Sequence, residues 1–181
     1  MSINIRPAQP NDRTAVTQLH IDLSRSAYAH ILSAEYLAET LAAEKQALWI
    51  ERLGSYPDPE RLAVTVAERG ETVIGFSCFL FDPYDLRGAY LHNLYVHQSA
   101  QRQGVARRLI GAGLDQFPQC PGAQGIYIKA FEENRPACSL YTQLGGSILE
   151  RVVVTRSQNP PAALLVYAWP SPDALRSALN A

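Results

Sequence analysis

The chain has 181 residues, of which 47% are hydrophobic and 18% charged, and its formal net charge is -1. This length suits one well-packed core rather than two, so we expect a single domain over residues 1–170, followed by a short C-terminal helix or tail at 171–181. The charge gives no electrostatic footprint for nucleic acid or an anionic membrane, and the apolar runs are too short to span a bilayer. Because no apolar signal region is visible near the first residue, we expect a cytoplasmic protein.

The spacing of apolar residues predicts alternating strands and helices. The first half contains a strand at 2–6, a helix that Asn11 caps, a second helix from Ser33 towards Leu53, a hairpin of strands at 61–68 and 72–81, and a strand at 90–96. The second half contains a helix from Gly104 that ends at Pro118, a strand at 125–131, a helix that Asn134 caps, an antiparallel pair at 148–155 and 162–169, and a helix at 173–179. Strands interleaved with helices imply a mixed sheet with helices on both faces.

The segment after the 90–96 strand is suited to hold phosphate. A glycine stands at the expected start of a helix in the run Gln101, Arg102, Gln103, Gly104, Val105, Ala106. The first N–H groups of a helix have no partner within it, and the helix dipole leaves partial positive charge there, so pyrophosphate can dock on the main chain. A glycine before a helix is about as often a simple cap or turn, so this segment alone leaves both interpretations open.

A second segment has the pattern of a complete capped helix. Asn134 is a suitable N-cap, Pro136 needs no N–H donor in the first turn, and Gly145 can close the C-terminus. The i, i+3, i+4, i+7 spacing of one helix face is met by Ala137, Leu140, Tyr141 and Leu144. This spacing places Tyr141 on the buried edge of the helix.

Together the two segments resemble the GCN5-related N-acetyltransferase (GNAT) family, in which a Gln/Arg-x-x-Gly-x-Gly/Ala turn precedes an Asn-x-x-Ala-x-x-Phe/Leu-Tyr-x-x-x-Gly helix. The resemblance extends to Ile5-Arg6-Pro7-Ala8 and to the hairpin around Gly70, and it covers about the whole chain in the expected order. It implies an α/β fold with a mixed sheet of about seven mostly antiparallel strands, a splayed central parallel pair and helices on both faces.

The resemblance also implies acetyl-CoA as co-substrate. Main-chain N–H groups of residues 102–106 would receive its pyrophosphate, and Arg102 or Arg107 could add contacts to phosphate oxygens. Backbone groups of Tyr95 and Val96 would lie along the pantetheine arm, although their side chains alone are typical of a core. The implied cofactor-binding set is Tyr95, Val96, Gln101, Arg102, Gln103, Gly104, Val105, Ala106, Arg107, Asn134 and Tyr141.

In the family, an acetyl group passes directly from acetyl-CoA to an amine through a tetrahedral intermediate, and the tyrosine of the second motif protonates the departing thiolate. Tyr141 holds that position here, and a phenol is a sensible donor to a developing sulfur charge. Without the resemblance, Tyr141 would more often be a core tyrosine that bonds to backbone. Asn134 likewise either only caps its helix or also meets the pantetheine.

The family commonly supplies a glutamate base from one of two strands, and this sequence departs from that pattern. Lys129 occupies the position where several relatives place the carboxylate. The other strand resembles the His-Leu-His of arylalkylamine acetyltransferases, and we expect its alternation to place on one face Tyr90, His92, Leu94 and Val96. His92 is therefore the candidate base, because imidazole titrates near working pH, although a packed core histidine is at least as common there. Glu132, Glu133 and water remain alternatives.

Three functions are compatible with the sequence. The first is acetylation of a primary amine of a small molecule. The second is acetylation of a protein or peptide N-terminus, which needs an open groove shaped by residues 24–56. The third is a non-catalytic acyl-CoA-binding sensor, motivated by Lys129. No two of the four histidines have the i, i+4 spacing of a helical metal site, and we predict no metal. The particular amine, the acyl length and a homodimer are left open.

Overall fold

Seven strands form one mixed sheet in the computed structural model, which describes residues 2–82, 84–117, 125–155 and 159–181. The strands are β1 (Ile3–Pro7), β2 (Leu62–Arg69), β3 (Thr72–Leu80), β4 (Ala89–Val96), β5 (Ile126–Phe131), β6 (Ser147–Val154) and β7 (Ala162–Trp169). Their order across the sheet is β1-β2-β3-β4-β5-β7-β6. The predicted number of strands is confirmed.

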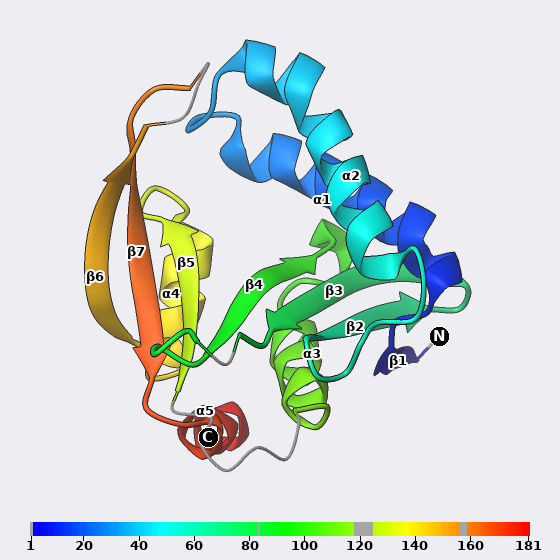
Figure 1. Ribbon diagram of the computed structural model, residues 1–181, viewed down its shortest axis with the longest axis vertical. Coiled ribbons are helices and arrows are strands. Elements are labelled where there is room, and N and C mark those ends of the chain that lie inside the picture. The colour runs from blue at the N-terminus through cyan, green and yellow to red at the C-terminus, as the bar shows by residue number, and fades with distance from the viewer. Residues whose placement is uncertain (1, 83, 118–124, 156–158) are drawn as a thin grey trace.

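The centre of the sheet is its one parallel pair. β4 and β5 pair only at Ala89–Ile126 and Tyr90–Tyr127, whereas the other neighbours are antiparallel along most of their length. Beyond Tyr90 the two strands diverge, and Figure 1 shows the two halves of the sheet opening away from each other. The predicted splayed pair is therefore confirmed.

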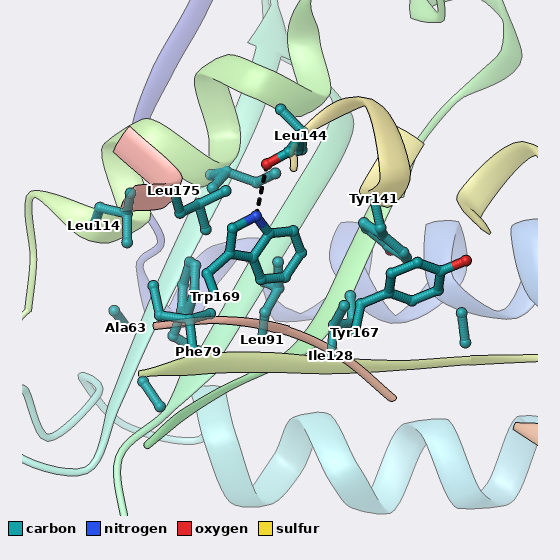
Figure 2. Packing of buried hydrophobic residues seen from close by; sticks show 14 of the residues in the cluster. Ala63, Phe79, Leu91, Leu114, Ile128, Tyr141, Leu144, Tyr167, Trp169 and Leu175 are labelled. Atoms are coloured by element: carbon teal, nitrogen blue, oxygen red, sulfur yellow. Dashed lines mark hydrogen bonds between the residues drawn. The ribbon is translucent and has the colours of Figure 1, made fainter. Parts of the chain in front are cut away.

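Helices cover both faces of the sheet, as the sequence predicts. One face carries α1 (Arg13–Tyr28) and α2 (Leu41–Leu53), whose Val16, Trp49 and Leu53 pack with strand residues Phe76 and Cys78. The other face carries α3 (Val105–Leu114), α4 (Arg135–Gln143) and α5 (Pro172–Asn180). Figure 2 shows the centre of this second core, where the Trp169 Nε1–H donates to the Leu144 carbonyl over 2.6 Å.

Two helix starts show how local chemistry sets the boundaries. Asp12, rather than Asn11, precedes α1, after a short 3-10 turn at Pro10–Asp12. Arg6 holds the Asp12 carboxylate through two hydrogen bonds of 2.7 and 2.8 Å, which lowers the pKa of Asp12. Ser33 does cap the next helical segment, because its Oγ accepts from the Tyr36 N–H. That segment continues as a π-helical turn, Tyr36–Thr40, before α2.

α3 ends at Leu114, before Pro118, at which the sequence predicts its end. Pro118 itself lies outside the described residues. In the described part of the chain, no helix is long and apolar enough to cross a membrane. The same part contains no group of three or more His, Cys, Asp or Glu side chains that could hold a metal ion.

A β-bulge in β4 changes which side chains share a face. Cys78 pairs with Asn93 and Phe79 pairs with Leu91, so His92 is the extra residue between them. An extra residue reverses the alternation of the strand that follows it. Leu94 and Val96 consequently pack towards the α3 face, whereas His92 contacts Arg52 of α2 on the opposite face. The predicted alignment of His92 with Leu94 and Val96 on one face is therefore wrong.

Candidate active site

The turn between β4 and α3 exposes main-chain donors. Arg102 and Gly104 both have positive φ angles, 61° and 73°, and such left-handed residues in a turn curve the backbone into a concavity of N–H groups. Within the described chain, the N–H groups of residues 102–106 donate no hydrogen bond of ordinary geometry to the main chain. A Cβ built on Gly104 would meet no atom within 4 Å. The residues therefore fit a pyrophosphate group on their main chain.

Two side-chain amides form hydrogen bonds that stabilise the conformation of this turn. The Gln101 Nε2 donates to the Val96 carbonyl over 3.1 Å, and the Gln103 Nε2 donates to the Ser99 carbonyl over 2.9 Å. Arg69 of β2 in turn donates to the Gln103 Oε1. These amides are committed to the loop itself, so the contribution of Gln101 and Gln103 to an anion site lies in the shape of the main chain.

The arginines near the turn have different surroundings. Arg107 donates to the carbonyls of Ala178 and Leu179 over 2.8 and 3.1 Å, and so caps the C-terminal end of α5. Arg108 donates to the Ile3 carbonyl. Arg102 is exposed at the turn itself. Of the two arginines that the sequence offers for a phosphate, the geometry favours Arg102.

The C-terminal half of β4 offers main chain rather than side chains. Tyr95 and Val96 pair with β3 on one edge, and β5 has already diverged from the other edge. The Tyr95 ring stacks on Phe76 at 5.3 Å, and its hydroxyl shares a 3.0 Å hydrogen bond with the Tyr28 hydroxyl. The side chain of Tyr95 thus belongs to the α1 face of the core. Val105 is buried as well and anchors the first turn of α3.

Tyrosines from three elements gather where β4 and β5 part, and we call them the tyrosine cluster: Tyr28 of α1, Tyr90 and Tyr95 of β4, and Tyr141 of α4. The Tyr141 side chain is 4% exposed, and its ring lies 5.6 Å from the ring of Tyr167 (Figure 2). Burial first, and then the neighbouring phenols Tyr95 and Tyr90, raise the pKa of Tyr141 well above its ordinary value. Tyr141 therefore stays protonated at neutral pH, and its hydroxyl can donate a hydrogen bond.

Asn134 fulfils its predicted structural role. Its Oδ1 accepts from the Ala137 N–H over 3.4 Å, and its carbonyl accepts from the Cys138 N–H over 3.0 Å. This capping fixes the first turn of α4, seven residues before Tyr141. Asn134 is thus a positioning residue for the helix that carries Tyr141, and a contact with the pantetheine stays a prediction.

His92 sits in a polar cluster on the α2 face. Arg52 Nη1 lies 3.2 Å from His92 Nδ1 and 2.8 Å from Asn93 Oδ1, and the two β4 side chains are 2.9 Å apart. A guanidinium only donates, so Nδ1 accepts from Arg52 when Nε2 carries the proton, and donates to Asn93 when Nε2 is bare. Burial and the Arg52 charge lower the pKa of His92 to about 4. The ring is therefore neutral at pH 7, and it is a weaker base than the imidazole titrating near working pH that the sequence suggests.

The alternative bases lie in other surroundings. Glu132 forms a bidentate ion pair with Arg151, whose shortest contact is 2.6 Å, and this partner lowers the pKa of Glu132. Glu133 is exposed just before α4. Lys129 is exposed on β5, with Nζ 5.5 Å from the Tyr90 ring and 6.0 Å from the Tyr127 ring. The position where relatives place a carboxylate is thus a cation packed over aromatic rings.

Sequence reasoning missed one contributor to the site, Arg52, because it is one of several charged residues along α2 and belongs to no motif. It becomes a functional candidate only through its contacts with β4. Tyr28, whose aromatic side chain the sequence offers as a possible contact for an amine, bonds to Tyr95 of β4 and packs against Phe131 of β5 at 5.2 Å, so it joins the two diverging strands.

Comparison with known proteins agrees with this geometry. The model of the acetyltransferase (GNAT) family matches residues 25–146. A probable N-acetyltransferase of Mycobacterium tuberculosis is 31% identical over 120 residues, which make up 65% of this chain and 66% of that protein. The spermine/spermidine N(1)-acetyltransferase of Bacillus subtilis is 23% identical over 150 residues, 80% of this chain and 88% of that protein.

The fold is also found among solved structures. The PaiA N-acetyltransferase from Thermoplasma acidophilum, solved in complex with coenzyme A, superposes with a TM-score of 0.71 at 19% identity and covers 94% of this chain and 99% of its own. The family match spans both the turn of residues 101–106, which we call the phosphate turn, and the Asn134–Gly145 segment. The chain therefore belongs to the acetyltransferase (GNAT) family of acetyl-CoA-dependent N-acetyltransferases.

Proposed function

We propose that this protein transfers an acetyl group from acetyl-CoA to a primary amine of a small molecule, by direct attack and without an acyl-enzyme. The proposal rests on the relative positions of the phosphate turn and Tyr141. The phosphate turn follows β4, and Tyr141 lies where β4 parts from β5. A cofactor held at the turn and along the unpaired edge of β4 would bring its thioester to the tyrosine cluster.

The residues then have separate tasks. The N–H groups of residues 102–106 bind the pyrophosphate, with the Arg102 side chain nearby. The main chain of Tyr95 and Val96 supports the extended arm of the cofactor. The thioester supplies the activated acetyl group. The amine nitrogen forms a bond to the acetyl carbon, the C–S bond breaks, and the Tyr141 hydroxyl gives a proton to the departing thiolate. The second proton lost by the nitrogen then returns to the Tyr141 oxygen through solvent, which restores the phenol.

The proton lost by the ammonium is assigned to His92 through a water molecule. His92 is neutral at pH 7, and its Nε2 accepts a proton when Nδ1–H donates to the Asn93 oxygen. The nearby Arg52 charge makes a lasting imidazolium costly, so the ring passes the proton on rather than storing it. Glu132 is engaged with Arg151, which makes it the weaker candidate.

We expect an NMR titration of the histidine rings to show His92 neutral from pH 8 down to pH 5.5, with a midpoint near pH 4. Removing the cation with Arg52→Gln should move that midpoint up towards the ordinary value of about 6.5. His92→Ala should lower kcat by about 10²-fold, the lower end of the usual general-base effects. The control is His30→Ala, an exposed loop residue that should leave kcat unchanged. Equal kcat in both variants would remove His92 from the proton path.

Contacts at the acceptor side support a small molecule rather than a peptide. The Asn159 Oδ1 accepts from the Ser33 N–H over 3.0 Å, and this bond joins the connection after α1 to the hairpin of β6 and β7 (Figure 1). Tyr28 adds its contacts to Tyr95 and Phe131 below this bridge. A peptide lying across the site would have to displace these contacts. The similarity to a spermine/spermidine acetyltransferase points to small amines as well.

The test is release of CoA from acetyl-CoA with a panel of amines, comprising aralkylamines, polyamines, amino acids, aminoglycosides and peptides with free N-termini. We expect turnover on one class of small amine. Turnover confined to peptides would establish N-terminal acetylation instead. Stoichiometric binding of acetyl-CoA without turnover on any amine would establish the sensor function that Lys129 suggests.

A further inference from the structure

The inward face of α2 presents a line of three side chains: Lys45, Trp49 and Arg52, at the i, i+4, i+7 spacing of one helix face. Trp49 is fully buried and packs in the core, and the Arg52 guanidinium lies 5.9 Å from its ring. Arg52 is only 9% exposed, which is uncommon for an arginine. Arg52 also lies beside the candidate base His92.

The Arg52 charge has no carboxylate partner in the described chain. Its three contacts are all made by Nη1 to neutral groups, Cys78 Sγ at 3.6 Å, His92 Nδ1 and Asn93 Oδ1. A buried cation without a counter-charge is costly, and the usual remedy is a nearby acid. In the described chain no acid pairs with Arg52, so the free-energy cost of burying its charge is not offset.

The remaining donors of Arg52 point to a ligand. Nε and Nη2 make no hydrogen bond to a described residue. Among the fully buried side-chain nitrogens and oxygens of the described chain, the Ser24 Oγ alone has no hydrogen-bond partner, so Nε and Nη2 are not fully buried. Nε and Nη2 therefore reach space that solvent or a ligand can enter. A guanidinium edge with two such donors matches the geometry of a carboxylate.

Other charges around His92 have the same sign. The chain has two lysines, Lys45 and Lys129, and after burial and Arg52 both act to disfavour a charged His92 ring. Two acids of neighbouring elements are engaged elsewhere: Glu44 accepts from the Tyr36 hydroxyl, and Asp85 pairs with Arg87 and Tyr127. The acceptor end of the site is thus electropositive, which suits an anionic group and repels a second ammonium.

From this arrangement we infer that the acceptor is an amine with an adjacent carboxylate, as in an α-amino acid, whose carboxylate binds Arg52 and is attracted by Lys129. The inference rests on the proposed acetylation of small amines and specifies their class. The amine must lie near His92, and Arg52 Nη1 is itself 3.2 Å from that ring, so the amine and the carboxylate of the acceptor lie close together. Polyamines, which carry several positive charges, are poor acceptors.

The experiment compares acceptors that differ only in the carboxylate: phenylalanine with phenethylamine, and methionine with 3-(methylthio)propylamine, with spermidine alongside. The wild-type protein should prefer each amino acid by at least tenfold in kcat/KM. Arg52→Gln should lower the ratio of kcat/KM between each amino acid and its paired amine roughly 10- to 100-fold, as expected for lost charge-assisted hydrogen bonds to the carboxylate, because any effect of the variant on His92 is common to both members of a pair. Arg176→Gln, on an exposed α5 residue, is the control and should leave this ratio unchanged.

Lys129→Gln keeps the test falsifiable if Arg52→Gln does not fold, because Lys129 is exposed and glutamine removes its charge without adding a carboxylate base. This loss of charge should lower kcat/KM for the amino acids more than for the paired amines. An equal loss on both members of each pair in Arg52→Gln would show a purely structural arginine and overturn the inference. Wild-type turnover of spermidine or phenethylamine above the amino acids would also overturn it, while acetyl transfer to amines would stand. No turnover on any amine would refute the proposed function itself.

Discussion

We expect Tyr141→Phe to lower kcat by about 10²- to 10⁴-fold while the Kd for acetyl-CoA changes less than threefold. The substitution removes one hydroxyl from a ring that is 4% exposed and leaves its packing in place. Because burial holds the pKa of Tyr141 well above its ordinary value, the group is a proton donor throughout neutral and mildly alkaline pH. Its loss should therefore affect the collapse of the tetrahedral intermediate rather than binding.

Tyr167→Phe is the matched control for this experiment. Tyr167 is also a buried tyrosine, on β7, with its ring 5.6 Å from Tyr141 (Figure 2). Removing its hydroxyl should leave kcat within about threefold of the wild type, because it belongs to the packing around Tyr141 and not to the tyrosine cluster at the β4–β5 divergence. A kcat that is the same in Tyr141→Phe and the wild type would contradict the assignment of Tyr141 as the acid.

Gly104→Val should weaken binding of acetyl-CoA by roughly 10- to 100-fold, the value of one or two hydrogen bonds to a charged group. Gly104 has a φ of 73°, which valine adopts at a cost on the order of 1–3 kcal/mol. A Cβ at this position meets no protein atom within 4 Å, so the added side chain occupies the open space over the N–H groups where pyrophosphate would dock. Calorimetric titration with CoA measures the effect.

Gly145 provides an unusually close control. It also has a φ of 73°, and a Cβ there also meets nothing within 4 Å, but it closes the C-terminal end of α4 rather than the phosphate turn. Gly145→Val should therefore lower the free energy of unfolding by a similar amount while CoA binding stays intact. Equal affinities for CoA in the two variants would reject the position assigned to the pyrophosphate.

The elements of the fold were largely predictable, because each one is specified by neighbours in the chain. Periodicity located every strand to within about two residues, and the caps at Ser33 and Asn134 formed the hydrogen bonds that their residue types favour. Asn11 was the exception: Arg6 of β1 holds Asp12, and this contact between elements sets the start of α1. Boundaries that depend on a distant partner are not visible in local sequence.

By itself, the sequence determined the family, the order of the seven strands along the chain, the turn at Gly104 before a helix, and the helix that carries Tyr141. All of these depend on residues close together in the chain. The tertiary structure alone decided that a bulge at His92 turns Leu94 and Val96 to the other face, and that Arg52 lies buried against His92 with no carboxylate partner among the residues that the structure describes. Register and burial are set by pairing across the sheet and by helix packing. The positive charge of Arg52 beside His92 is therefore visible only in the tertiary structure, where α2 packs against β4.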